Sequence, residues 1–248
     1  MQLAEGRARP APTSRPRRGL SCLVGLGGAL LCALALPATG ARLAELGGRA
    51  AAERLAAGGP LTEEGYRRLL AANDRARSWL AEPRLLKDLG VTLHAIATRE
   101  VETAAGPAAL LAEAREALVE GLEEAPADPI AWLQLAQLDY ALLNLAGAAA
   151  ALRASHAVGA VAPEIAVVRT GLALGLWGWL AEPVRERASA ELVASFLTDP
   201  GTLTRIARAT GTVEVVRARL EGNSPALAAL ERELAALARA GAGSGGAG

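Results

Sequence analysis

The stretch YRRLLAANDRARSWL, residues 66 to 80, carries the pattern that decides the fold. Its apolar residues recur at spacings of three and four, which is the periodicity of an α-helix. The same spacing continues almost everywhere after residue 42, whereas the alternation of β-branched residues that is typical of strands is almost absent. The sequence therefore predicts an all-α protein.

Prolines indicate where the helices begin. Proline is favoured at the first helical position, because its missing N–H has no partner there. Asp128, Asp199 and Ser224 each precede such a proline as expected capping residues, and Thr62 is expected to cap another helix. The glycine-rich end, residues 240–248, is expected to be disordered. We expect helices at about residues 42–57, 62–81, 83–104, 107–124, 129–143, 146–158, 163–181, 183–197, 200–209, 212–221 and 225–239.

The N-terminal part of the chain has the charge pattern of a membrane-entering segment. Five arginines and one glutamate precede Gly19, and no further charge follows until Arg42. As a helix, residues 19–41 would be about 34 Å long, against roughly 30 Å for the hydrocarbon core of a bilayer. Residues 1–18 are then a basic cytoplasmic terminus, and everything after Arg42 is exported. We expect a single-pass protein of a bacterial inner membrane whose bulk is periplasmic.

Two outcomes remain open for residues 19–41, a retained transmembrane anchor or a cleaved signal peptide. Ala38 and Gly40 are small residues at the positions that a signal peptidase reads, and Pro37 is expected to end the apolar helix there. The apolar part is long for a signal core, which favours the anchor. Cleavage would instead release the protein into the periplasm.

The exported part is mildly acidic and offers little catalytic chemistry. Of the chain's 26 basic and 26 acidic residues, 21 and 25 lie from Arg42 onward, which argues against a nucleic-acid partner because phosphate binding needs a basic face. Both cysteines lie within residues 19–41, and His94 and His156 are far apart in the sequence. We therefore assign no metal site, no cofactor site and no catalytic residue, and we expect His156 to be half-buried.

Two segments of the exported part match each other, AREALVEGLEEAP at residues 114–126 and ASAELVASFLTDP at residues 188–200. In each, alanine is followed by leucine after four residues, a small residue after seven, a large apolar residue after eight and proline after twelve. A third copy without the proline begins at Ala148, 34 residues after the first. The segment WLQLAQLDY, residues 132–140, follows the first copy closely.

Together these segments resemble the tetratricopeptide repeat, whose 34-residue unit is two antiparallel helices. The resemblance implies an α-solenoid of helical hairpins over residues 83–210. N-terminal helices at 42–82 would precede it and C-terminal helices at 211–239 would follow it. The family's tyrosine is missing from its expected place, which Asp139 occupies.

The same resemblance implies an inner groove that receives Leu133, Gln137 and Tyr140. Relatives that bind a partner's C-terminal carboxylate have lysine, arginine and asparagine at these places, and this chain does not. An apolar or helical ligand therefore fits better than a chaperone tail.

The segment LALGLWGWLA, residues 172–181, is the most apolar stretch outside the N-terminal segment. It is too short to span a bilayer, and the glycines in and beside it predict a central helix packed closely against another. Trp177 and Trp179 cannot both face the core, so at least one is expected to be partly exposed, and we include both among the candidate partner-binding residues.

Two functions from different classes fit the sequence. The first is a non-enzymatic periplasmic scaffold that holds another envelope protein, in a machine that we expect to export or assemble surface polysaccharide; a homo-oligomer is compatible with this function. The alternative is an exported hydrolase of cell-wall or glycan substrates that uses carboxylates such as Glu120, Glu123 and Glu124. Solvated helix faces explain these glutamates better, because no nucleophile or oxyanion donor lies nearby in the sequence.

Overall fold

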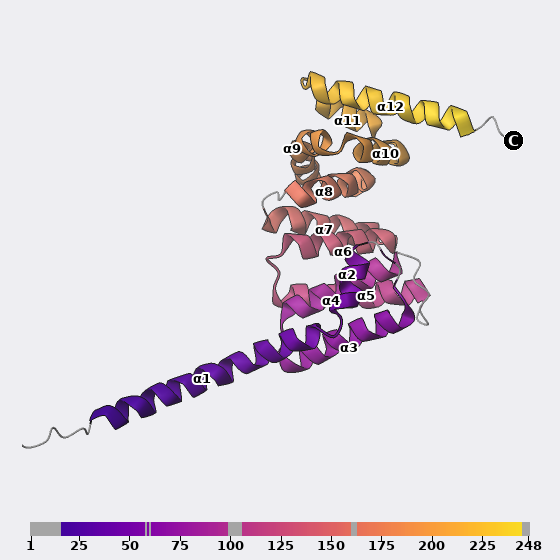
Figure 1. Ribbon diagram of the computed structural model, residues 1–248. Coiled ribbons are helices and arrows are strands. Elements are labelled where there is room, and N and C mark those ends of the chain that lie inside the picture. The colour runs from indigo at the N-terminus through magenta and orange to yellow at the C-terminus, as the bar shows by residue number, and fades with distance from the viewer. Residues whose placement is uncertain (1–15, 58, 60, 99–105, 160–162, 245–248) are drawn as a thin grey trace, which may run out of the picture.

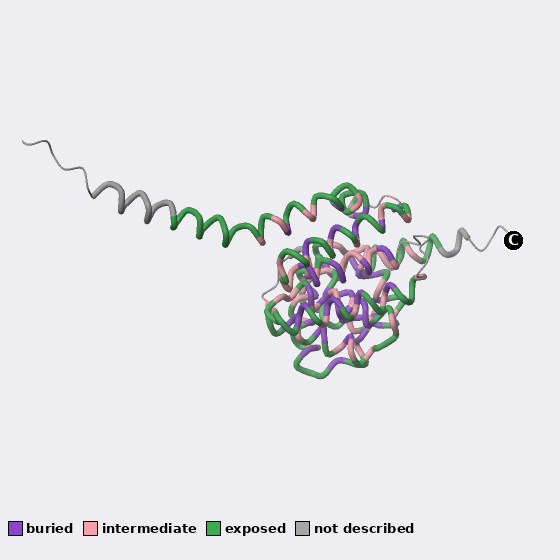
Figure 2. Tube along the Cα trace, turned by 90° about the horizontal axis from the view of Figure 1, so that it is seen from below, coloured by how far each residue is buried: buried purple, intermediate pink, exposed green. Residues whose placement is uncertain are grey.

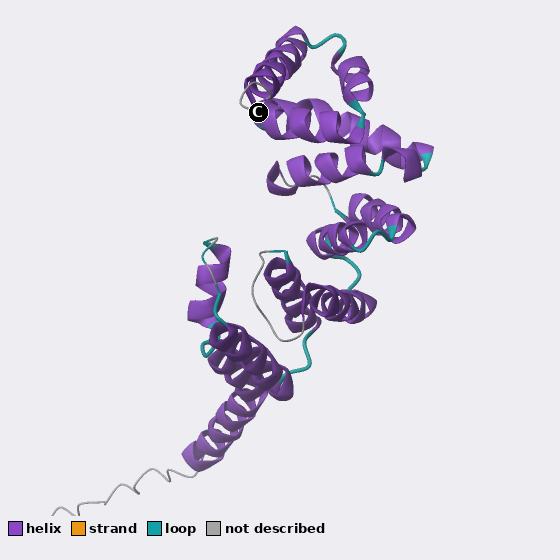
Figure 3. Ribbon diagram, turned by 90° about the vertical axis from the view of Figure 1, so that its right-hand side faces the viewer, coloured by secondary structure: helices purple, strands orange, loops and turns teal. Residues whose placement is uncertain are grey.

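The computed structural model describes residues 16–57, 59, 61–98, 106–159 and 163–244. This part of the chain is all-α and contains no strand (Figure 3). Its elements are α1 (Pro16–Glu45), α2 (Arg49–Ala56), α3 (Glu63–Trp79), α4 (Pro83–Ala97), α5 (Gly106–Glu124), α6 (Pro129–Ala141), α7 (Leu145–Val158), α8 (Pro163–Gly175), the 3-10 helix η1 (Trp177–Trp179), α9 (Glu182–Thr198), α10 (Pro200–Thr210), α11 (Val213–Leu220) and α12 (Ser224–Ser244).

Capping side chains fix several helix starts, as the sequence predicted. Thr62, Asp128 and Asp199 each accept hydrogen bonds from backbone N–H groups in the first turn of the helix that follows. The prediction for Ser224 is wrong by one residue, because the side-chain oxygen of Asn223 accepts the bond from the N–H of Ala226. Proline opens α4, α6 and α10, where its missing N–H costs nothing.

The N-terminal helix is longer than predicted. It passes through Pro37, which was expected to end it, and continues to Glu45, so the predicted helix 42–57 is divided between α1 and the separate helix α2. One proline removes only one backbone hydrogen bond, and the residues after it pack against α3 and α4. Ala41 is 2% exposed in this contact, so the helix beyond the proline is held by tertiary packing.

The helices that follow are stacked in chain order from α3 to α12, and α1 projects away from the stack (Figure 1). Residues 26–36 of α1 are all exposed, whereas buried and exposed residues alternate around the stack (Figure 2). In the part of α1 whose side chains are described, five leucines between Leu26 and Leu36 are each at least 60% exposed. By length and composition, this helix could span a membrane or act as a signal sequence.

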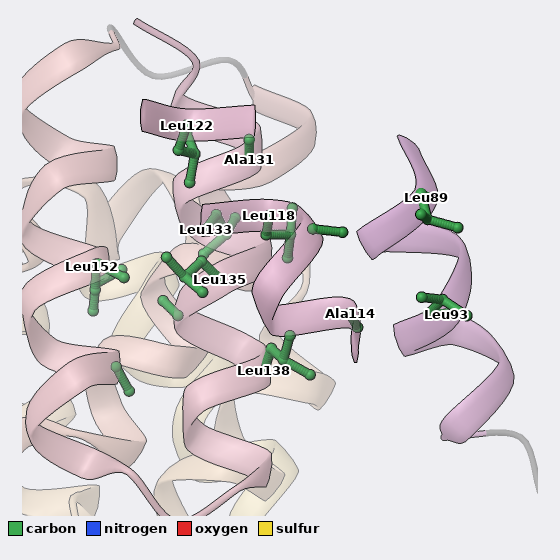
Figure 4. Packing of buried hydrophobic residues seen from close by; sticks show 14 of the residues in the cluster. Leu89, Leu93, Ala114, Leu118, Leu122, Ala131, Leu133, Leu135, Leu138 and Leu152 are labelled. Carbon is green, nitrogen blue, oxygen red and sulfur yellow. The ribbon is translucent and has the colours of Figure 1, made fainter. Parts of the chain in front are cut away.

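Two apolar clusters hold the stack together. The larger runs from Leu55 to Ala188, and its leucines from α4, α5, α6 and α7 lie close together (Figure 4). The second joins α8 to α12 around Phe196, Leu203 and Leu230. Apart from the proline, the matched positions of the three internal copies are all buried: Ala114, Leu118, Gly121, Leu122, Ala148, Leu152, Ser155, His156, Ala188, Leu192, Ser195 and Phe196.

Close approach of backbones is most evident between α4 and α5. A Cβ added at Gly90 would lie 2.8 Å from the carbonyl oxygen of Ala114, and one added at Gly121 would lie 2.9 Å from that of Pro83. Glycine is therefore required at both places, since real Cβ atoms almost never come this close to another atom.

Three other predicted segments differ at their ends. The predicted helix 163–181 ends at Gly175, and η1 follows it, because glycines at 175 and 178 weaken the helix there. Trp179 is 57% exposed, which confirms that one tryptophan of this segment is partly exposed.

Residues 240–244 continue α12 instead of being disordered, while 245–248 lie outside the described residues. The helix predicted over residues 83–104 ends at Ala97, and residues 99–104 lie outside the described residues.

Candidate functional site

A groove of about 550 Å³ crosses the stack on one side. Four helices line it, and they are alternate ones in the chain: α4, α6, α8 and α10. The side chains that matter most for its shape and chemistry are those of His94, Gln137, Tyr140, Val168, Leu172 and Ile206.

Two glycines of α8 make room for this groove. A Cβ at Gly175 would lie 3.1 Å from the hydroxyl oxygen of Tyr140, and one at Gly171 would lie 2.8 Å from Cδ1 of Ile206. The side chains of α6 and α10 thus reach across α8 from both sides. These contacts partly confirm the expected close packing at the glycines, although Gly178 has no neighbour within 4 Å.

The structure brings together two of the three residues that were expected in the groove. Gln137 and Tyr140 line it, and Tyr140 is 37% exposed. The prediction for Leu133 is wrong, because this side chain is 2% exposed and belongs to the larger apolar cluster. The N-terminal half of α6 is enclosed on several faces, since Ala131 and Leu135 are buried beside Leu133.

The two candidate tryptophans do not lie in the groove. Trp179 lines a separate hollow of about 220 Å³ with residues of α7 and the start of α9. The guanidinium of Arg185 lies 6.0 Å from the ring centroid of Trp177, and its Nε donates a hydrogen bond to the carbonyl oxygen of Trp177. These contacts give Trp177 a structural role in the corner between α8 and α9.

The groove as lined carries no carboxylate, lysine or arginine. His94 supplies the one imidazole among the residues that line the groove. Burial lowers the pKa of His94, and the hydrogen bond with Gln134 only partly offsets this shift. The imidazole is therefore neutral at neutral pH. The sequence offered no reason to place His94 beside Tyr140, since the two lie on helices separated by α5.

A buried ionic network lies behind the groove, and sequence reasoning missed it. Arg169 of α8 is 0% exposed and binds Glu191 of α9 through two hydrogen bonds, Nε to Oε2 at 3.0 Å and Nη2 to Oε1 at 2.8 Å. Its Nη1 donates to the carbonyl oxygen of Ser155, and Nδ1 of His156 lies 3.2 Å from Oε1 of Glu191. His156 is thus buried, not half-buried as expected.

The environment of Glu191 favours its charged form. Burial alone would raise the pKa of Glu191, but the hydrogen bonds from His156 and Arg169 and their charges lower it below its ordinary value. A single arginine inside the apolar run of α8 was the available signal for this network, because a charge on a buried face needs a partner.

A second buried carboxylate explains the departure from the repeat pattern at Asp139. This side chain is 2% exposed and accepts hydrogen bonds from Nε of Arg115 at 2.7 Å and Nδ2 of Asn144 at 3.1 Å. It ties α5 to the turn between α6 and α7. Asp139 therefore has a structural role. A tyrosine at this position, as in the repeat family, would leave Arg115 without its carboxylate partner.

Carboxylates gather at one further place, a hollow of about 310 Å³ between α3, α4 and α5. Asp74, Glu82, Glu120 and Glu124 line it, and Arg77 lies 3.8 Å from Glu120. Among the described residues, no group of three or more histidine, cysteine or acidic side chains is arranged to hold a metal ion.

No protein-family model matches the chain, and no similar curated protein or solved structure was found.

Proposed function

We propose that this chain is a non-enzymatic, membrane-anchored scaffold whose tetratricopeptide-like helical pairs hold another protein of the bacterial envelope. The groove that crosses α4, α6, α8 and α10 is the observation that carries this proposal. An uncharged groove lined by isoleucine, leucine, valine and tyrosine suits the apolar face of a partner helix.

The alternation of helices supports the repeat character of the stack. The groove is lined by the even-numbered helices, while the buried matched positions of the three internal copies lie on α5, α7 and α9. In a repeat of helical pairs, the first helices form one surface and the second helices form the other. This alternation supports the proposal of an α-solenoid over residues 83–210.

The location that we propose is the inner membrane, with α1 as a retained anchor. Leu26–Glu45 is the one described segment long and apolar enough to cross a bilayer, at a mean hydropathy of 1.5. Beyond the small residues that a signal peptidase could read, the helix continues without a break into the contact with α3, where Ala41 is buried. Cleavage after Gly40 would cut this helix inside a packed contact, which favours retention over cleavage.

The basic residues before Gly19 place the stack on the periplasmic side in this proposal. We propose that the partner protein belongs to a machine that exports or assembles surface polysaccharide. This assignment rests on the exported position alone. The alternative function, a carboxylate-dependent hydrolase of glycans, would use the hollow between α3 and α5. Glu120 is 57% exposed there and paired with Arg77, so its surroundings give little of the desolvation that tunes a catalytic acid.

Combining Tyr140→Ala with Gln137→Ala is expected to weaken binding of the partner while the protein stays folded. Truncation of an aromatic interface anchor commonly costs more than about 1 kcal/mol of binding free energy, which corresponds to a roughly fivefold rise in Kd. Both side chains line the groove and neither is fully buried, so the core is unchanged. The measurement is the Kd for the partner isolated by crosslinking, together with thermal unfolding of the variant.

Glu123→Ala is the control for this experiment, because Glu123 is exposed and does not line the groove. It should change neither binding nor stability. The proposal would be abandoned for the hydrolase if Glu120→Gln or Glu124→Gln abolished function in a stable protein while the groove pair had no effect.

A further inference from the structure

An exposed tryptophan lies where α1 joins the stack. Trp79 ends α3 and is 54% exposed, and its indole ring lies directly against Gly40 of α1. A Cβ at position 40 would collide with three atoms of this ring. Gly40 therefore gives the ring its place beside the apolar helix.

The length of the uncharged segment places this contact at a particular depth. Arg18 is the last basic residue before the segment, and a hydrocarbon core of about 30 Å takes roughly 20 helical residues at 1.5 Å each. Counting from Gly19, the outer boundary of the hydrocarbon falls within about one turn of Gly40. Trp79 is thus at the level where the acyl chains meet the headgroups.

The joint between α1 and the stack is held by charges as well as by packing. Nη2 of Arg84, at the start of α4, lies 2.6 Å from Oε1 of Glu45, and its Nη1 lies 2.6 Å from Oδ2 of Asp88. Leu43, between Gly40 and Glu45, is 63% exposed. Arg84 therefore links the end of α1 to the start of α4, and an apolar side chain continues the exposed surface just beyond Gly40.

We propose that Trp79 inserts into the outer headgroup layer of the membrane that α1 crosses and so fixes how the stack stands on that membrane. Tryptophan prefers this layer because its ring is apolar and its indole N–H finds polar partners there. The partner surface is the bilayer itself, because the exposed ring is continuous with the lipid-facing surface of α1. This inference rests on the proposed membrane anchoring.

Fluorescence quenching of the full chain in phosphatidylcholine vesicles tests the insertion. In the test protein Trp79 is the only tryptophan, and in the control protein Trp179 is the only one. In each protein the other three tryptophans are replaced by Phe. Trp179 is a matched control because it is 57% exposed but lies on η1, between α8 and α9 in the chain. These two helices are far from α1 in the stack (Figure 1). Lipids brominated close to the headgroup should quench Trp79 more than lipids brominated at the chain end, and neither should quench Trp179.

A reciprocal variant keeps the test independent of the triple replacement. In the otherwise native chain, Trp79→Phe should remove the quenched part of the emission, whereas Trp179→Phe should leave it. If protein that floats with the vesicles shows equal quenching for Trp79 and Trp179, the insertion of Trp79 is wrong although the anchor stands. If the protein does not float with the vesicles, both the anchor and the insertion are wrong.

Discussion

Glu191→Gln is expected to lower the free energy of unfolding by about 3–5 kcal/mol, because it leaves Arg169 buried without a charged partner. The guanidinium is 0% exposed and both of its bonds to α9 end on this carboxylate. Glutamine has nearly the same shape but no charge, and it accepts through one oxygen only. Urea unfolding followed by circular dichroism measures the loss. The exposed Glu186 on the same helix is the control, and Glu186→Gln should change stability by less than about 0.5 kcal/mol.

The pH dependence of the same pair gives a second measurement. Because the pKa of Glu191 is lowered in the folded protein, its charge contributes stability above the unfolded-state pKa, and this contribution is lost as the pH falls through the folded-state pKa. The stability difference between wild type and Glu191→Gln should therefore be largest near neutral pH and shrink in acid. An equal difference at every pH, or none, would contradict the network of Arg169, Glu191 and His156.

Gly90→Leu is expected to cost about 3 kcal/mol, at the upper end of the usual range for overpacking. A Cβ at position 90 would lie 2.6 Å from Cγ of Leu118 and 2.8 Å from the carbonyl oxygen of Ala114, so α5 would have to move away from α4. Leucine is the better helix former by about 0.8 kcal/mol, so a net loss must come from packing. Thermal unfolding of the purified protein measures it.

Gly178→Leu serves as the matched control, because a Cβ at that glycine has no neighbour within 4 Å. It should leave the midpoint of unfolding nearly unchanged. Equal stability of Gly90→Leu and wild type would mean that α4 and α5 do not pack this closely.

Local patterns in the sequence were sufficient for the fold class and for most helix starts. Spacings of three and four predicted helices, and the caps at Thr62, Asp128 and Asp199 act within one turn, so both are visible over a few residues. The course of α1 through Pro37 was not visible, because a contact with α3 decides it.

The candidate groove was predictable only in part. The repeat resemblance pointed to Gln137 and Tyr140, which line the groove, and wrongly to Leu133, because the pattern does not say how deeply the start of α6 is enclosed. Val168 and Ile206 join the groove from helices that are distant in the sequence. Such pairings depend on how helices stack and leave no local trace, whereas Arg169 inside the apolar run of α8 signalled a buried partner without identifying Glu191.

The proposed scaffold function is tested most directly by photocrosslinking from the groove in intact cells. A photoreactive amino acid replaces Val168, which lines the groove at 43% exposure, and in a matched protein it replaces Leu197, which is 53% exposed on α9. We predict one discrete protein adduct from position 168, none from position 197, and loss of the adduct when Tyr140→Ala and Gln137→Ala are added. The same adduct from both positions, or an adduct at position 168 that survives the groove substitutions, would contradict the proposed function.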